Sequence, residues 1–154
     1  MTAKLMSSIP SKILVAVEGS EPSLKESSMK AARYTIEIAA NFHSEIVAIC
    51  VVQIPEYIEE NTRAKLHDEL FAKSGKTLDE IRELALVSNI KFSSKTLETS
   101  GGISTTICNF SEKENVDLIV LGTRANVSNL TKMMLGSVAS GVVGNSNCPV
   151  LVVR

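Results

Sequence analysis

The sequence has few cysteines and no long apolar run, and each shortage excludes a class of protein. Its cysteines, Cys50, Cys108 and Cys148, are odd in number, widely spaced and form no CxxC pair, so neither a disulfide framework nor a zinc site is indicated. The longest apolar run, 46–52, is far shorter than the roughly 18 residues that a membrane span needs. The first ten residues lack the hydrophobic core of a signal peptide. We therefore expect a cytoplasmic protein that does not associate with membranes.

The sequence also lacks a net charge large enough to attract a polyanion. Sixteen basic and 17 acidic residues give a net charge of -1, so no chain-wide field recruits nucleic acid. The length of 154 residues, with 44% hydrophobic and 21% charged residues, is typical of one globular domain. There is no internal repeat or linker. We expect a flexible N-terminal segment at 1–11 and one domain at 12–154.

Apolar runs and helical spacing alternate along the chain. Runs rich in β-branched residues predict five strands, with the third more polar, like an edge strand: 12–17, 45–52, 91–98, 117–122 and 149–153. Apolar residues at helical spacing predict four helices between them, the last one closed by Gly144: 23–41, a stripe over 66–84, 103–110 and 136–143. This alternation, with connections much longer than a hairpin, predicts an α/β fold with an open parallel sheet and helices on both faces.

Two strands end in residues that suit the ligand-binding edge of such a sheet. The first is followed by 18–20, with the carboxylate of Glu18, and the fourth ends at Gly122, before Arg124. Further along, Gly136 and Ser137 open the last helix, whose free amides and positive dipole end favour an anion such as phosphate. The alternative is that this glycine and serine supply only turn and cap chemistry.

Four segments together carry a resemblance to a known family. They are Val-Ala-Val-Glu-Gly-Ser-Glu at 15–21, Asp-Leu-Ile-Val-Leu-Gly-Thr-Arg at 117–124, Leu-Gly-Ser-Val-Ala-Ser at 135–140 and Cys-Pro-Val-Leu-Val-Val at 148–153. In this order and spacing they resemble the universal stress protein family, over essentially the whole chain from Lys12 to Arg154. The resemblance implies a five-stranded sheet of order 3-2-1-4-5, a common dimeric state, and a site for ATP or AMP at the strand ends in nucleotide-binding members.

The chain departs from the family's nucleotide signature at two points. That signature is glycine, two residues, glycine, nine residues, then glycine followed by serine or threonine, and Gly122, Gly136 and Ser137 match its outer parts. The middle glycine falls on Ala125 or Asn126, and asparagine tolerates left-handed backbone geometry far better than alanine. Glu18 stands where nucleotide-binding relatives usually carry aspartate. The pocket is therefore expected to be retained in altered form.

The resemblance implies ten nucleotide-contacting residues. On the nucleoside side they are Ala16, Val17, Glu18 and Val51, and on the phosphate side Gly122, Arg124, Asn126, Gly136, Ser137 and Val138. Each has a simpler interpretation. Val17 and Val51 are explained as sheet core, Glu18 as an exposed carboxylate at a helix start, and Arg124 as a solvated loop cation.

Our leading hypothesis is a stress-response protein that binds ATP, with or without Mg²⁺, or AMP, and acts as a ligand-dependent interaction module. We also expect a homodimer that forms through the last strand, 150–153. One alternative is a nucleotide-free dimerising member of the same family, and a weaker one is a slow ATP hydrolase. No catalytic residue or protein-held metal is assigned, because neither histidine belongs to a ligand cluster and no GxxxxGK, GxGxxG or GxSxG is present.

Overall fold

The computed structural model describes residues 9–18, 22–123 and 135–154, which form five strands that alternate with four helices. The strands are β1 (Lys12–Val17), β2 (Glu45–Gln53), β3 (Phe92–Thr99), β4 (Leu118–Gly122) and β5 (Val150–Val153). The helices are α2 (Pro22–Phe42), α3 (Glu60–Val87), α4 (Ile103–Lys113) and α6 (Ser137–Asn145). The predicted alternation is confirmed, although α3 extends beyond its predicted stripe at both ends.

The expected closure of the last helix at Gly144 is wrong. This glycine lies inside α6, which continues to Asn145. None of the described glycines has a positive φ, so Gly144 does not form the left-handed turn that commonly ends a helix. The helix instead ends at Ser146, where the backbone becomes extended.

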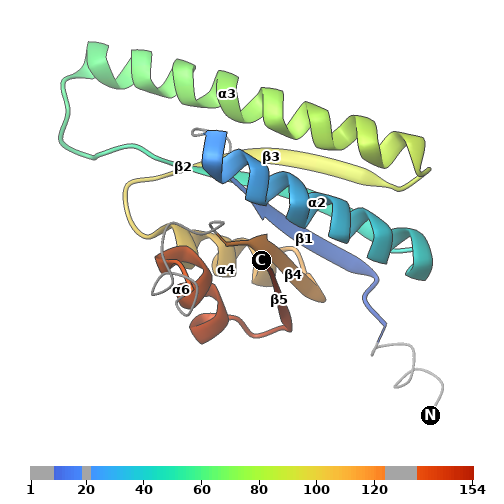
Figure 1. Ribbon diagram of the computed structural model, residues 1–154. Coiled ribbons are helices and arrows are strands. Elements are labelled where there is room, and N and C mark those ends of the chain that lie inside the picture. The colour runs from blue at the N-terminus through green and yellow to red at the C-terminus, as the bar shows by residue number, and fades with distance from the viewer. Residues whose placement is uncertain (1–8, 19–21, 124–134) are drawn as a thin grey trace.

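All five strands are parallel and lie in the order β3-β2-β1-β4-β5, as the sequence resemblance implied. Figure 1 shows α2 and α3 on one face of the sheet and α4 and α6 on the other. Because β1 lies between β2 and β4, the chain moves outward from β1 toward both edges of the sheet. The carboxyl ends of β1 and β4 therefore form a switch point, where sheets of this kind bind ligands.

The strands bury both of their faces, in two separate apolar clusters. In β1, Ile13 and Val15 pack with α2 and α3, whereas Leu14 packs with α4 and α6. The same alternation holds in β2, where Ile49 and Cys50 point to opposite clusters. Near-continuous apolar runs are what this double burial requires, which explains why the strands were recognisable in the sequence.

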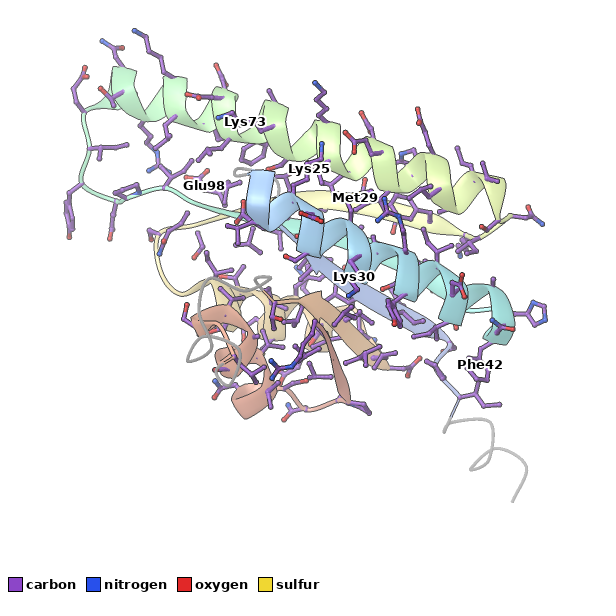
Figure 2. All side chains as sticks on the ribbon, in the orientation of Figure 1. Lys25, Met29, Lys30, Phe42, Lys73 and Glu98 are labelled. Atoms are coloured by element: carbon purple, nitrogen blue, oxygen red, sulfur yellow. The ribbon has the colours of Figure 1, made fainter. Side chains whose placement is uncertain are left out.

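The two helices on the first face are joined by both charge and packing. Figure 2 labels Lys25 and Met29, which lie one turn apart on α2. The Lys25 Nζ lies 2.7 Å from Oε1 of Glu80 on α3, while the Met29 side chain is buried in the cluster beneath. None of the helices formed by the described residues combines the length and apolar character that a membrane crossing requires.

At the amino ends of the strands, one carboxylate ties two neighbouring strands together. Oδ2 of Asp117, just before β4, accepts hydrogen bonds from Ser11 N at 2.9 Å, Ser11 Oγ at 2.6 Å and Lys12 N at 2.9 Å. Burial raises the pKa of Asp117, but these hydrogen bonds together outweigh it and leave the pKa below its ordinary value. The ionised carboxylate therefore stabilises the start of β1 against β4.

Candidate functional site

A cavity of about 580 Å³ opens at the carboxyl ends of β1 and β4. This volume lies in the range typical of small-molecule sites. Eight of the ten residues implied by the resemblance line it: Ala16, Val17, Glu18, Val51, Gly122, Gly136, Ser137 and Val138. The other two, Arg124 and Asn126, lie outside the described residues. Segments distant in sequence thus meet at one hollow, while contact with a nucleotide stays a prediction.

Apolar side chains from both faces of the sheet form much of the cavity wall. Leu24 comes from α2, and Ile103 and Ile107 come from α4, one turn apart. Val51 comes from the neighbouring strand β2 and is buried. Walls of this kind, in which apolar side chains outnumber polar ones, suit the less polar part of a small ligand.

The backbone at the end of β1 is tied to α2 beside the cavity. The amide of Glu18 donates a hydrogen bond of 2.7 Å to Oγ of Ser28, whose side chain is buried. Glu18 itself is partly buried and lines the cavity. This contact fixes the path of the chain where β1 ends at the rim of the cavity.

Gly122 has a packing role that the sequence analysis did not identify. A Cβ atom at this position would lie 2.5 Å from the backbone oxygen of Ser27 on α2, closer than real Cβ atoms approach. The glycine therefore lets the end of β4 and the second turn of α2 pack together. This contact accounts for a glycine at this position of the chain, with or without a ligand.

Gly136 contrasts with Gly122, because no atom of the described structure requires a glycine there. A Cβ atom at Gly136 would meet nothing within 4 Å, and its φ of -61° suits any residue. Gly136 is the N-cap of α6, makes no side-chain cap hydrogen bond, and is followed by a first turn without an acidic residue. The positive end of the helix dipole thus faces the cavity without a negative side chain in that turn.

Several cavity residues were missed by the sequence analysis. They are Leu24, Ser27, Ser28, Ile103, Ile107, Leu121, Thr123, Leu135 and Ala139. Ile103 and Ile107 belong to the predicted helix 103–110, whose spacing does not indicate a role in a site. For the residues of α2, the sequence predicts the helix. It does not predict the rotation of the helix about its axis, which brings Leu24 and Ser28 to the ends of the strands.

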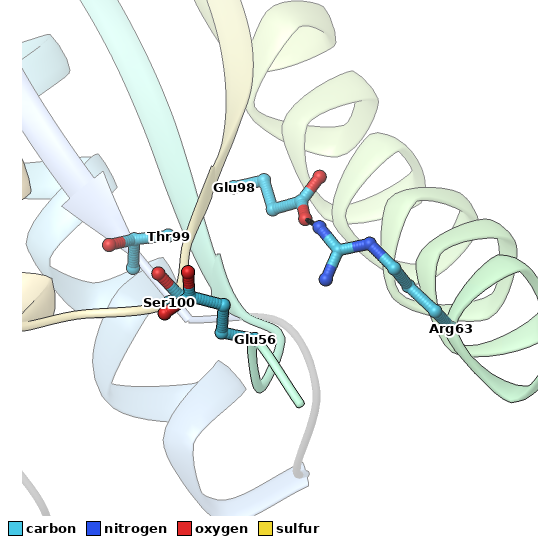
Figure 3. A pocket seen from close by; sticks show the side chains of 5 residues that line it. All are labelled: Glu56, Arg63, Glu98, Thr99 and Ser100. Carbon is cyan, nitrogen blue, oxygen red and sulfur yellow. Dashed lines mark hydrogen bonds and ion pairs between the residues drawn. The ribbon is translucent and has the colours of Figure 1, made fainter. Parts of the chain in front are cut away.

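A second, smaller hollow of about 420 Å³ lies at the carboxyl ends of β2 and β3. Figure 3 shows its lining side chains, with Arg63 of α3 pointing toward Glu98 of β3. These two side chains form an ion pair, and Nη1 of Arg63 also donates a 3.2 Å hydrogen bond to the carbonyl oxygen of Pro55. The guanidinium is therefore already engaged by protein groups, and none of the predicted site residues lies in this hollow.

In the part of the chain that the structure describes, no group of three His, Cys, Asp or Glu side chains is arranged to hold a metal ion. The larger cavity offers one described carboxylate, that of Glu18.

Comparison with curated proteins finds relatives over nearly the whole chain. The universal stress protein MJ0531 of Methanocaldococcus jannaschii is 35% identical over 146 residues, covering 93% of this chain and 81% of that protein. The universal stress protein YxiE of Bacillus subtilis is 30% identical over 148 residues, covering 93% of this chain and 98% of that protein.

Solved structures share the fold. The structure of protein MJ0577 matches with a TM-score of 0.77 at 25% identity, over 94% of this chain and 96% of that one. A universal stress protein of Archaeoglobus fulgidus in complex with dAMP matches with a TM-score of 0.68 at 18% identity, over 95% and 99% of the two chains. An Arabidopsis thaliana family protein with AMP bound matches with a TM-score of 0.68 at 19% identity, over 94% and 91%.

The model of the universal stress protein family matches residues 10–154. Together with the relatives, this match shows that the chain belongs to the universal stress protein family.

Proposed function

We propose that this protein binds an adenine nucleotide, ATP or AMP, in the cavity between β1 and β4 and acts as a ligand-dependent interaction module. The observation that carries the proposal is the convergence of Glu18, Gly122 and Gly136 on one 580 Å³ cavity at the switch point of the sheet. The structures of two family members, one with dAMP and one with AMP, support an adenine nucleotide as the ligand.

The lining favours one orientation of the nucleotide. The base would lie among apolar residues near Val51 and Ile107, with Glu18 accepting hydrogen bonds from the sugar hydroxyls. The phosphates would lie at the start of α6, where the amides after Gly136 and the hydroxyl of Ser137 are donors. Arg124 and Asn126 complete the proposed phosphate side.

Calorimetric titration with AMP and with ATP, each with and without Mg²⁺, tests the proposal directly. Mass spectrometry of small molecules released from the freshly denatured protein tests it independently. We expect saturable binding with a dissociation constant below the millimolar range. No released nucleotide and no binding below that range would reject the proposal.

The second candidate is a nucleotide-free dimer of the same family. It is favoured by the packing role of Gly122, which accounts for one signature glycine without a ligand. In both candidates the dimer would form through β5, the last strand of the sheet, which pairs with β4 on one edge. Dimers by light scattering together with an empty cavity would favour the second candidate, and a strict monomer at high concentration would reject pairing through β5.

Slow ATP hydrolysis is the weakest candidate. In-line phosphoryl transfer needs a positioned water and a metal ion that bridges the phosphates, and Glu18 is the one described carboxylate at the cavity. Phosphate release that rises linearly with protein concentration and is lost in Gly136→Asp would support hydrolysis.

A further inference from the structure

Two of the three cysteines lie on either side of the contact between α4 and the chain that follows α6. Cys108 is on α4 and is buried, whereas Cys148 lies just before β5 and is partly exposed. Both side chains pack in the apolar cluster beneath α4 and α6. Cys50 packs in the cluster on the opposite face of the sheet.

A short series of contacts connects the two sulfur atoms. Sγ of Cys108 lies 4.0 Å from the carbonyl oxygen of Val142 in α6. The same oxygen accepts a 2.9 Å hydrogen bond from the amide of Ser146, whose Oγ lies 3.5 Å from Sγ of Cys148. One carbonyl and one serine therefore separate the two thiols along this route.

A second contact joins the same two segments. Glu112, one turn after Cys108 on α4, accepts a hydrogen bond from Nδ2 of Asn147, the residue before Cys148. Burial raises the pKa of the Cys108 thiol, and electrostatic interactions with Cys148 and Glu112 raise it further. The electrostatic effect of Cys148 on Cys108 agrees with the proximity indicated by the contacts.

We propose that Cys108 and Cys148 form a reversible intrachain disulfide when the protein meets a hydroperoxide. The proposal does not depend on nucleotide binding. Cys148 is the more exposed of the two, so its thiolate attacks a peroxide oxygen, forming a sulfenic acid and releasing hydroxide, or an alkoxide from an organic peroxide. Cys108 then attacks the oxidised sulfur through its thiolate, and hydroxide leaves and is protonated to water. Two thiols and one hydrogen peroxide thus give one disulfide and two waters.

The fold gives this bond a structural consequence. It would join α4 directly to the segment between α6 and β5, closing a loop that contains the whole of β4 and α6. Cross-links of this kind restrict the unfolded chain, so the oxidised protein should unfold at a higher temperature than the reduced protein. Ile107, the residue before Cys108 on α4, lines the large cavity, although neither cysteine does.

The test uses the full chain treated with hydrogen peroxide, followed by alkylation and intact-mass measurement. We expect alkylation of the denatured, peroxide-treated chain to add one alkyl group, on Cys50, where the reduced chain gains three. Peptide mapping without reduction should find Cys108 linked to Cys148, and dithiothreitol should restore both thiols. Cys50→Ser is the matched control on the opposite face of the sheet and should oxidise like the unaltered protein.

Two variants separate the roles of the thiols. In Cys148→Ser, Cys108 should remain reduced under the same peroxide treatment. In Cys108→Ser, a sulfenic acid on Cys148 should be trapped by dimedone. A free Cys108 in the peroxide-treated unaltered chain, a link to Cys50, or a covalent dimer through Cys148 in place of the intrachain bond would each overturn the proposal.

Discussion

Gly122 at the end of β4 and Ser27 on α2 approach so closely that a single added carbon would lie 2.5 Å from the Ser27 carbonyl oxygen. The atom in the way belongs to the helix backbone, so a change of rotamer cannot relieve the contact. This relationship sets the spacing between α2 and the sheet at the rim of the large cavity, because both residues line it. The position of the cavity wall therefore depends on the absence of a side chain at one residue.

Gly122→Ala should lower the free energy of unfolding by about 1–3 kcal/mol, the range expected when an extra carbon is forced into a packed interior. Urea denaturation followed by circular dichroism measures the change. Gly144→Ala is the matched control, since its added carbon meets nothing within 4 Å. Equal stability of Gly122→Ala and the unaltered protein would show that α2 shifts freely away from β4.

Gly75→Ala should have the opposite effect. Gly75 lies inside α3, and a Cβ atom there meets nothing within 4 Å. Because alanine loses less backbone freedom in a helix than glycine does, the free energy of unfolding should rise by about 0.5–1 kcal/mol. The same urea titration measures it, and a fall in stability would mean that α3 requires flexibility at this point.

Asp117→Asn should destabilise the protein most at neutral pH. The native carboxylate accepts hydrogen bonds from Ser11 and Lys12, so its pKa in the folded chain lies below the unfolded value of about 3.9. The stabilisation is fully present above that unfolded value and is lost as the pH falls through the folded pKa. We expect a loss of about 1–2 kcal/mol at pH 7, the size of a hydrogen bond to a charged group at a partly exposed site.

The comparison that isolates this effect uses the difference in unfolding free energy between Asp117→Asn and the unaltered protein, measured by urea titration from neutral pH to about pH 3. The difference should shrink as the pH falls below about 4. Asp79→Asn is the control, because Asp79 is exposed on α3 and makes no ion pair or hydrogen bond in the described structure. A difference that is constant with pH would mean that Asp117 acts through shape alone.

The strands could be predicted from the sequence because strands that are buried on both faces consist almost entirely of apolar residues. Runs such as 45–52 are apolar at every position, and the structure buries them on two sides. Element ends were harder to predict. α3 begins at Glu60 after an N-cap, Glu59, that makes no side-chain cap bond, so the sequence carries no start signal there. α2 is followed by His43 with φ of 57°, a left-handed backbone position that non-glycine residues adopt only rarely, so the end of this helix was hard to predict.

The residues of the candidate site could be predicted where their position depends only on the end of a strand or the start of a helix. Residues at strand ends and at the start of α6, such as Glu18, Gly122 and Gly136, could be identified because a parallel sheet brings these positions to one edge. Ser27 and Ser28 could not, since their place at the cavity depends on how α2 is rotated against β4. The strand order and the nucleotide itself came from the family resemblance and not from residue patterns.

The start of α6 provides the sharpest test of where a phosphate would bind. Gly136→Asp places a carboxylate at the N-cap, where its oxygens would accept hydrogen bonds from the same amides that we assign to phosphate. Its negative charge would also repel a phosphate, so AMP and ATP affinity should fall at least about tenfold, or about 1.4 kcal/mol. The fold should be unaffected, because the position is open and its φ of -61° suits aspartate.

Gly144→Asp adds the same charge at the other end of α6, away from the cavity, and should bind nucleotide like the unaltered protein. Calorimetric titration of both variants with AMP and ATP makes the comparison. If Gly136→Asp and Gly144→Asp bind the nucleotides with equal affinity, the phosphates do not bind at the start of α6.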